Sequence, residues 1–156
     1  MTLEGLNQRF IAMKHKAEST GPLAAADAMA ESGKQIVQEL LSRPGRSAPG
    51  MPPGLQSGHL RDTMMVTPAF MIGDAMAEAQ VFPTAVYARV LEFGGLLWPG
   101  SHTFLKIQGG GKPNAYAKTV FIAERPYMRR MRQDGIASGE FKRVSKEAFI
   151  ATVVDL

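Results

Sequence analysis

A segment dense in proline and glycine divides this chain into two unlike parts. Residues 43–58 hold eight such residues, a density that neither a helix nor a central strand accepts: Pro44, Gly45, Pro49, Gly50, Pro52, Pro53, Gly54 and Gly58. The segment therefore predicts a long loop. Because loops of this length are usually functional or become ordered against a partner, residues 46–55 are a candidate contact arm, with a floppy connector as the alternative.

Two helices are predicted before this loop. Apolar residues recur there at steps of three and four, which places them on one helical face: Leu3, Leu6, Phe10, Met13 and Ala17. Gly21 and Pro22 interrupt this pattern, since glycine ends helices and proline is tolerated only in a first turn. A second helix is expected from about residue 23 to residue 41.

Strand patterns follow the loop. Alternating apolar residues predict a β-hairpin from residue 61 to residue 82, with a turn at 72–74 and with Pro68 at an edge or a bulge. Thr84 is expected to cap a short helix that Gly94 and Gly95 stop. Residues 96–107 and 116–123 are two further strand candidates around a glycine tip at 109–111.

The chain ends in a helical pattern that begins near Pro126, breaks around residues 135–139 and resumes from Phe141. The predicted fold is α+β: N-terminal helices, a small, mostly antiparallel sheet with a short helix inserted, and a C-terminal helix packed on the sheet. One domain is expected over residues 1–156. Its parts are the helices at 1–42, the loop at 43–58, the sheet at 59–124 and the helical region at 125–156.

Composition narrows the classes of function. The chain of 156 residues is 45% hydrophobic, so it can bury a core, but no apolar run reaches membrane-spanning length. The N-terminus lacks the apolar stretch of a secretion signal, so the protein is expected to stay where it is made. With no cysteine, disulfides and thiolate metal sites are excluded.

No catalytic constellation is evident. His15, His59 and His102 fall in different predicted elements without metal-ligand spacing. The glycine tip resembles a phosphate loop, but Pro113 stands where Ser or Thr would meet magnesium. We therefore predict no enzyme, cofactor, metal or small-molecule substrate; a small hydrolase is a rival without a nucleophile, acid and base in credible spacing.

Glu92 is the one carboxylate in an apolar setting, between Leu91 and Phe93. A glutamate in such surroundings more often pairs with a cation than acts as an acid or base. Arg61 or Arg89 is the expected partner.

Positive charge gathers near the C-terminus. Residues 125–146 carry seven lysines and arginines against two acidic residues. Such a face can meet DNA or an acidic protein surface, although a run of this kind is more often the solvated side of a helix.

Three motifs, in order along the chain, resemble those of a bacteriophage family. They are the sequences at residues 57–64 (SGHLRDTM), 86–95 (VYARVLEFGG) and 125–130 (RPYMRR). They are similar to the Thr-Gly-x-Leu-Arg-x-Ser, Tyr-Ala-x-x-x-Glu-x-Gly-Thr and Pro-Phe-Leu-x-Pro-Ala patterns of the tail-component, tail-completion or head–tail joining proteins (minor tail proteins) of long-tailed phages. The resemblance covers residues 54–131.

Several positions depart from those patterns. Gly95 stands in place of Thr, Tyr127 and Met128 in place of Phe-Leu, and Arg130 and Met131 in place of Pro-Ala. The stretch from 96 to 124 is longer than the family leads us to expect, and it looks like an elaborated hairpin.

The resemblance implies a structural virion protein of the neck that completes the tail and joins it to the head. Copies are expected to form a ring, as a hexamer, against head-connector, tail-terminator or tail-tube proteins, in the virion at the neck or tail top and in the host cytoplasm during assembly. The motif residues implied to specify the fold are Gly58, Leu60, Arg61, Tyr87, Ala88, Glu92, Gly94 and Pro126.

Residues 46–55 and 96–113 are the hypothesised arms. The candidate partner contacts are Arg46, Met51, Leu55, Trp98, Lys112, Arg129, Arg130, Arg132 and Arg143. Two alternatives stay open: another neck connector or minor head protein, and a DNA-binding module that uses the basic C-terminal helix.

Overall fold

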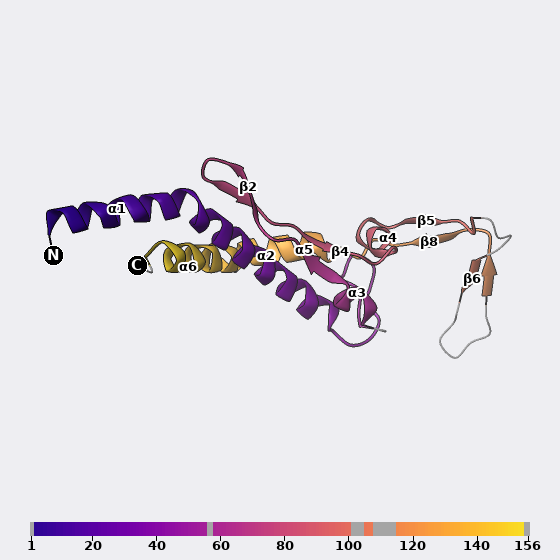
Figure 1. Cartoon of the computed structure of the whole chain (residues 1–156). Helices are drawn as coiled ribbons and strands as arrows, with labels where there is room; N and C mark the ends of the chain where they lie inside the picture. The colour runs from indigo at the N-terminus through magenta and orange to yellow at the C-terminus, as the bar shows by residue number, and fades with distance from the viewer. Residues whose placement is uncertain (1, 56–57, 101–104, 108–114, 155–156) are drawn as a thin grey trace.

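The computed structural model describes residues 2–55, 58–100, 105–107 and 115–154, and helices set its long axis (Figure 1). These helices are α1 (Leu3–Glu18), α2 (Thr20–Leu41), α5 (Met128–Ala137) and α6 (Glu140–Val154). The antiparallel pair of α2 and α6 makes the most extensive contact in the chain, and α1 touches both. The start of α1 and the end of α6 lie at the same end of the molecule.

The two predicted N-terminal helices are confirmed, with a small shift of the break between them. Ser19 separates α1 from α2, so Gly21 and Pro22 lie in the first turn of α2 and not before it. None of the residues of α1 is buried, and Leu3 and Phe10 are 87% and 61% exposed. The apolar face of α1 is therefore formed as predicted but is largely uncovered by the rest of the described chain.

The first hairpin is confirmed as a long, interrupted ribbon, although its turn lies at Asp74 and Ala75 and not at 72–74. Strand β1 (Met64–Val66) pairs with β4 (Val81–Pro83), and β2 (Phe70–Gly73) pairs with β3 (Met76–Glu78). The interruption lies at Pro68, as expected of a residue that cannot donate to a ladder. Asp27 of α2 fastens this point, since its Oδ1 accepts from the Ala69 N–H at 2.7 Å.

Two short helices flank the first ribbon: α3 (His59–Asp62) precedes β1, and α4 (Ala88–Phe93) follows β4 and leads into a second ribbon. It consists of β5 (Gly95–Leu97) paired with β8 (Val120–Ile122), and β6 (Leu105–Ile107) paired with β7 (Ala115–Ala117). The expected hairpin at this place is confirmed. The glycine tip at 109–111, His102, Lys112 and Pro113 lie outside the described residues.

The α+β class is confirmed, but two expected details of its packing are wrong. The described strands form four two-stranded ladders and not one sheet. Helix α6 packs mainly on α2 and not on strands, because α2 offers small residues such as Gly21 and Ala26 that admit another helix closely. The break between α5 and α6 is at Ser138 and Gly139, where φ of Gly139 is 73°.

Thr84 does not cap the short helix as expected. Helix α4 begins only at Ala88, after a turn, and has no side-chain cap. Thr84 instead donates through its hydroxyl and its N–H to the Thr63 carbonyl, at 3.3 and 3.1 Å, because it follows β4 directly and extends the pairing with β1.

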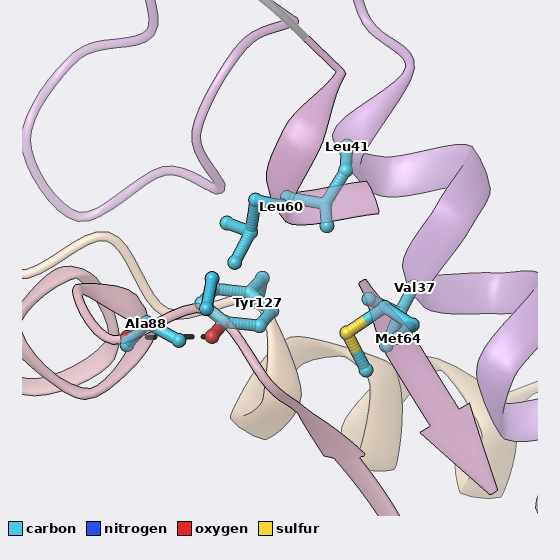
Figure 2. Close-up of a cluster of buried hydrophobic side chains, with 7 residues drawn as sticks. Val37, Leu41, Leu60, Met64, Ala88 and Tyr127 are labelled. Atoms are coloured by element: carbon cyan, nitrogen blue, oxygen red, sulfur yellow. Dashed lines mark hydrogen bonds between the residues drawn. The ribbon is translucent and has the colours of Figure 1, made fainter. Parts of the chain in front are cut away.

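The buried core lies where these elements meet, toward the C-terminal end of α2 (Figure 2). Tyr127, Met64 and Val37 are the largest fully buried side chains. They pack with the remaining members of the cluster: Leu41, Leu60, Ala85 and Ala88. Residues from both sides of the Pro/Gly-rich loop therefore share one core.

The contact between α2 and α6 generates a test at Gly21. A Cβ atom at this position would lie 2.7 Å from Cε2 of Phe149, closer than packed carbons approach. Gly21→Ala is expected to lower the free energy of unfolding by about 1–3 kcal/mol through overpacking, measured by urea denaturation. The control is Gly33→Ala on the same helix, where the nearest atom, Sδ of Met131, is at 3.4 Å; there alanine should be neutral or stabilise by up to about 1 kcal/mol. Equal effects at both sites would contradict the close packing.

Candidate functional site

The three sequence motifs converge on one buried junction. Leu60 of α3 and Ala88 of α4 pack with Tyr127, which directly precedes α5 (Figure 2). The Tyr127 hydroxyl donates to the Ala88 carbonyl at 3.3 Å. Residues that stand up to 67 positions apart in the sequence are thus neighbours in the fold, so these motif positions specify packing.

Glu92 forms the polar centre of this junction. Its side chain is 6% exposed, and its carboxylate accepts three backbone hydrogen bonds from the start of α5: from Tyr127 at 2.8 Å, Met128 at 3.0 Å and Arg129 at 2.9 Å. The first N–H groups of a helix have no partner within it, and they carry partial positive charge. Glu92 therefore caps α5 from a different helix.

The expected arginine partners of Glu92 are wrong. Arg61 pairs with its neighbour Asp62, Nε to Oδ1 at 2.7 Å, and Arg89 is exposed on α4. A helix terminus can replace an arginine here because three aligned N–H groups both satisfy and stabilise a buried carboxylate. One feature of the sequence indicates that α5 is capped from elsewhere in the chain. Neither Pro126 nor Tyr127 has a side chain that supplies the capping oxygen typical of a helix start.

The phenol of Tyr127 is held in its neutral form. Burial raises the pKa of Tyr127 above its ordinary value, with the negative charge of Glu92 as the second cause. The group stays protonated at neutral pH, as a donor to Ala88 must. The hydrogen bond from the Tyr127 hydroxyl to the Ala88 carbonyl is therefore retained at neutral pH.

Two motif glycines are required by backbone geometry. Gly94 ends α4 with φ of 69°, and a Cβ there would lie 2.8 Å from the Glu124 nitrogen and 2.9 Å from the Ile122 carbonyl oxygen. Gly58, with φ of 76°, starts α3. It leads the chain into the helical turn of α3, so the strand predicted from residue 61 begins only at Met64.

A largely apolar groove lies beside the junction. Its volume is about 700 Å³. Residues of the loop, α3, α4, the turn before α4 and the β5–β8 ribbon line it: Leu41, Ser47, Pro53, Gly54, Leu55, Gly58, His59, Leu60, Arg61, Val86, Tyr87, Val90, Leu91, Leu97, Ile122 and Arg125. The motif residues Gly58, Leu60, Arg61 and Tyr87 line the groove, and Leu60 also belongs to the junction.

The Pro/Gly-rich loop forms one wall of this groove. Arg125 donates to the Ser47 carbonyl at 2.8 Å and to its hydroxyl at 2.6 Å, and the Gly50 N–H donates to the Glu124 carbonyl at 2.9 Å. The described part of the loop therefore folds back on the body, in contrast to the projecting arm hypothesised for 46–55. Its contact role stays a prediction: Arg46 and Met51 are exposed, and Leu55 faces the groove.

The β5–β8 ribbon does project as an arm. It runs away from the helices, with β6 farther out (Figure 1). Leu96 stands opposite Phe121 in the ladder, and Trp98 is two residues beyond Leu96. All three side chains are more than half exposed, Trp98 at 66%. We call this surface the arm face.

The predicted basic contacts are exposed but mostly paired. Arg129 pairs with Glu124, Arg130 with Asp134, and Arg143 with both Glu140 and Glu147. The hydrogen bonds that Arg143 donates to Glu140 and then to Glu147 raise the pKa of Arg143, so its positive charge is fixed but locally compensated. Arg132 is exposed as well.

The described residues hold no group of three acidic or histidine side chains that could bind a metal ion. Within the same ranges, no helix has both the length and the apolar character to cross a membrane. In comparisons with protein families, curated proteins and solved structures, no match to this chain was found.

The Glu92 junction generates a stability test. Glu92→Gln places an NH₂ group against backbone donors and removes the charge that favours the helix terminus. We expect a loss of about 1–3 kcal/mol in the free energy of unfolding, measured by urea denaturation. The control is Glu147→Gln at an exposed position of α6, for which little change is expected. A Glu92 variant as stable as that control would contradict the capping role.

Proposed function

We propose that this chain is a structural virion protein of a tailed-phage neck, whose copies form a ring that completes the tail and joins it to the head. The observation that carries the proposal is the apolar surface that the chain leaves uncovered. Among the described residues, 22 large hydrophobic ones are exposed, whereas 11 hydrophobic residues are buried. Exposed apolar surface of this kind marks contacts with other subunits.

The extent of the whole surface supports the same reading. The chain exposes 10636 Å², about 1.4 times the roughly 7,700 Å² expected of a compact monomer of 16.9 kDa. Half of the described exposed apolar residues, 11 of the 22, lie on α1, the β2–β3 hairpin and the arm face. A ring subunit needs separate surfaces for its neighbours and for an axial partner, and these three stand apart on the molecule (Figure 1).

The ordered motifs indicate which assembly to expect. They meet at the junction that holds the base of the arm, and they resemble the tail-completion and head–tail joining family. A position as another neck connector or as a minor head protein would use the same surfaces. Labelling this protein on finished particles in electron micrographs distinguishes these positions, because the proposal requires label at the neck or tail top.

The ring proposal is tested on the purified full chain and on the phage that encodes it. We expect sedimentation to detect a closed oligomer at micromolar concentration, with six copies, and micrographs to show rings. Removing the gene should leave filled heads and unjoined tails. A chain that stays monomeric and is missing from finished particles would overturn the proposal.

The DNA-binding alternative is tested by fluorescence anisotropy with duplex DNA. Since Arg129, Arg130 and Arg143 are each paired with carboxylates, we expect weak affinity for the DNA, even at low salt. Replacing all three by alanine should change that affinity little. Tight binding that falls steeply with salt, and that is lost in the triple variant, would favour the DNA-binding module.

A further inference from the structure

The groove and the arm face form a complementary pair on one chain. The groove has largely apolar walls and a volume of about 700 Å³. Pockets of this volume accommodate a drug-sized molecule in other proteins. The arm face is an apolar projection led by Trp98. The groove and the arm face both expose apolar surface to water. A projecting face like the arm face would cover the groove, and a groove of this kind would cover the arm face.

A chain cannot place its own arm face in its own groove. Successive residues of a strand point to opposite faces. Leu97 and Ile122, on one face of the β5–β8 ribbon, line the groove, whereas Leu96 and Phe121, on the other face, point away from it. The arm face can therefore enter only the groove of another molecule.

We infer that the arm face of one copy seats in the groove of the next copy, with Trp98 as the anchor of the contact. This inference rests on the proposed ring. The contact joins two different surfaces of the same chain, so it repeats from copy to copy and closes where the rotation allows. A second copy is the occupant that covers both surfaces with a single contact.

The arm face supplies part of the area that such a contact needs. From their exposed fractions, Leu96, Trp98 and Phe121 offer on the order of 400 Å², given that buried aromatic side chains each cover about 150–250 Å². That is about half of the roughly 800 Å² that each partner contributes to a standard interface. On the partner that brings the arm, exposed Tyr116 of β7 and Phe93 at the base of the ribbon are available for the remainder.

The anchor carries its own probe, because Trp98 is the single tryptophan of the chain. On assembly of the full chain we expect its emission to shift to shorter wavelength and its quenching by acrylamide to fall.

Trp98→Ala should weaken association at least about 30-fold in sedimentation, the loss typical of an aromatic anchor. Val86→Asp, at the groove, should weaken it similarly. The matched controls are Ile136→Ala and Ile136→Asp at an exposed position of α5, outside the groove and the arm face; they should leave association within about threefold, while circular dichroism checks folding.

Cross-linking tests the direction of the contact, and the cysteine-free chain makes each introduced thiol unique. Thr119→Cys lies next to β8 on the arm, and Val86→Cys lies at the groove. A short bismaleimide should link the two variants when they are mixed and co-assembled, but should link neither variant to itself. The pair Thr119→Cys with Lys146→Cys, on α6, is the negative control.

The outcomes separate the inference from the proposed function. Rings in which Trp98 stays open to quencher and the mixed variants do not cross-link would overturn the inference and leave the ring in place. Cross-linking of Thr119→Cys to itself alone would replace it by a symmetric arm-to-arm contact. Shielding of Trp98 only after an axial neck protein is added would assign the arm to that protein. A chain that never associates contradicts both the inference and the ring.

Discussion

The described fold depends on one carboxylate placed against the start of a helix. Glu92 sits at the end of α4, yet its hydrogen bonds go to the first N–H groups of α5. This fixes the C-terminal helices relative to the segment that carries the groove. The cost of burying the charge is offset because the partners are pre-aligned backbone donors and a favourable helix dipole. Tyr127 then closes the core above it.

Elements with a strong local signal were predictable from the sequence. The helical spacing of α1, the break at Gly139 and the interruption at Pro68 are each set by residues within a few positions, so the pattern alone located them. The ending of α4 at Gly94 belongs to the same group, because its positive φ favours glycine.

The candidate site was predictable in its residues but not in its contacts. Glu92 was singled out as unusual, yet its partners are backbone atoms, which no residue letter displays. Thr84 has a side chain that can cap a helix, but because it directly follows β4 it donates hydrogen bonds to Thr63 instead. The groove joins residues from Leu41 to Arg125, so it exists only once the loop has folded back.

Both strands of the β5–β8 ribbon begin or end next to the Glu92 junction. Strand β5 leaves immediately after Gly94, two residues beyond Glu92, and β8 returns through Glu124 and Arg125 to the start of α5. The Arg125 N–H also donates to the Leu91 carbonyl at 2.7 Å, which ties the two roots together. A pull on the ribbon would therefore act on the Arg125–Leu91 hydrogen bond and on those of Glu92. The junction around Glu92 thus connects the ribbon to the helices, so any force on the ribbon reaches the helices through it.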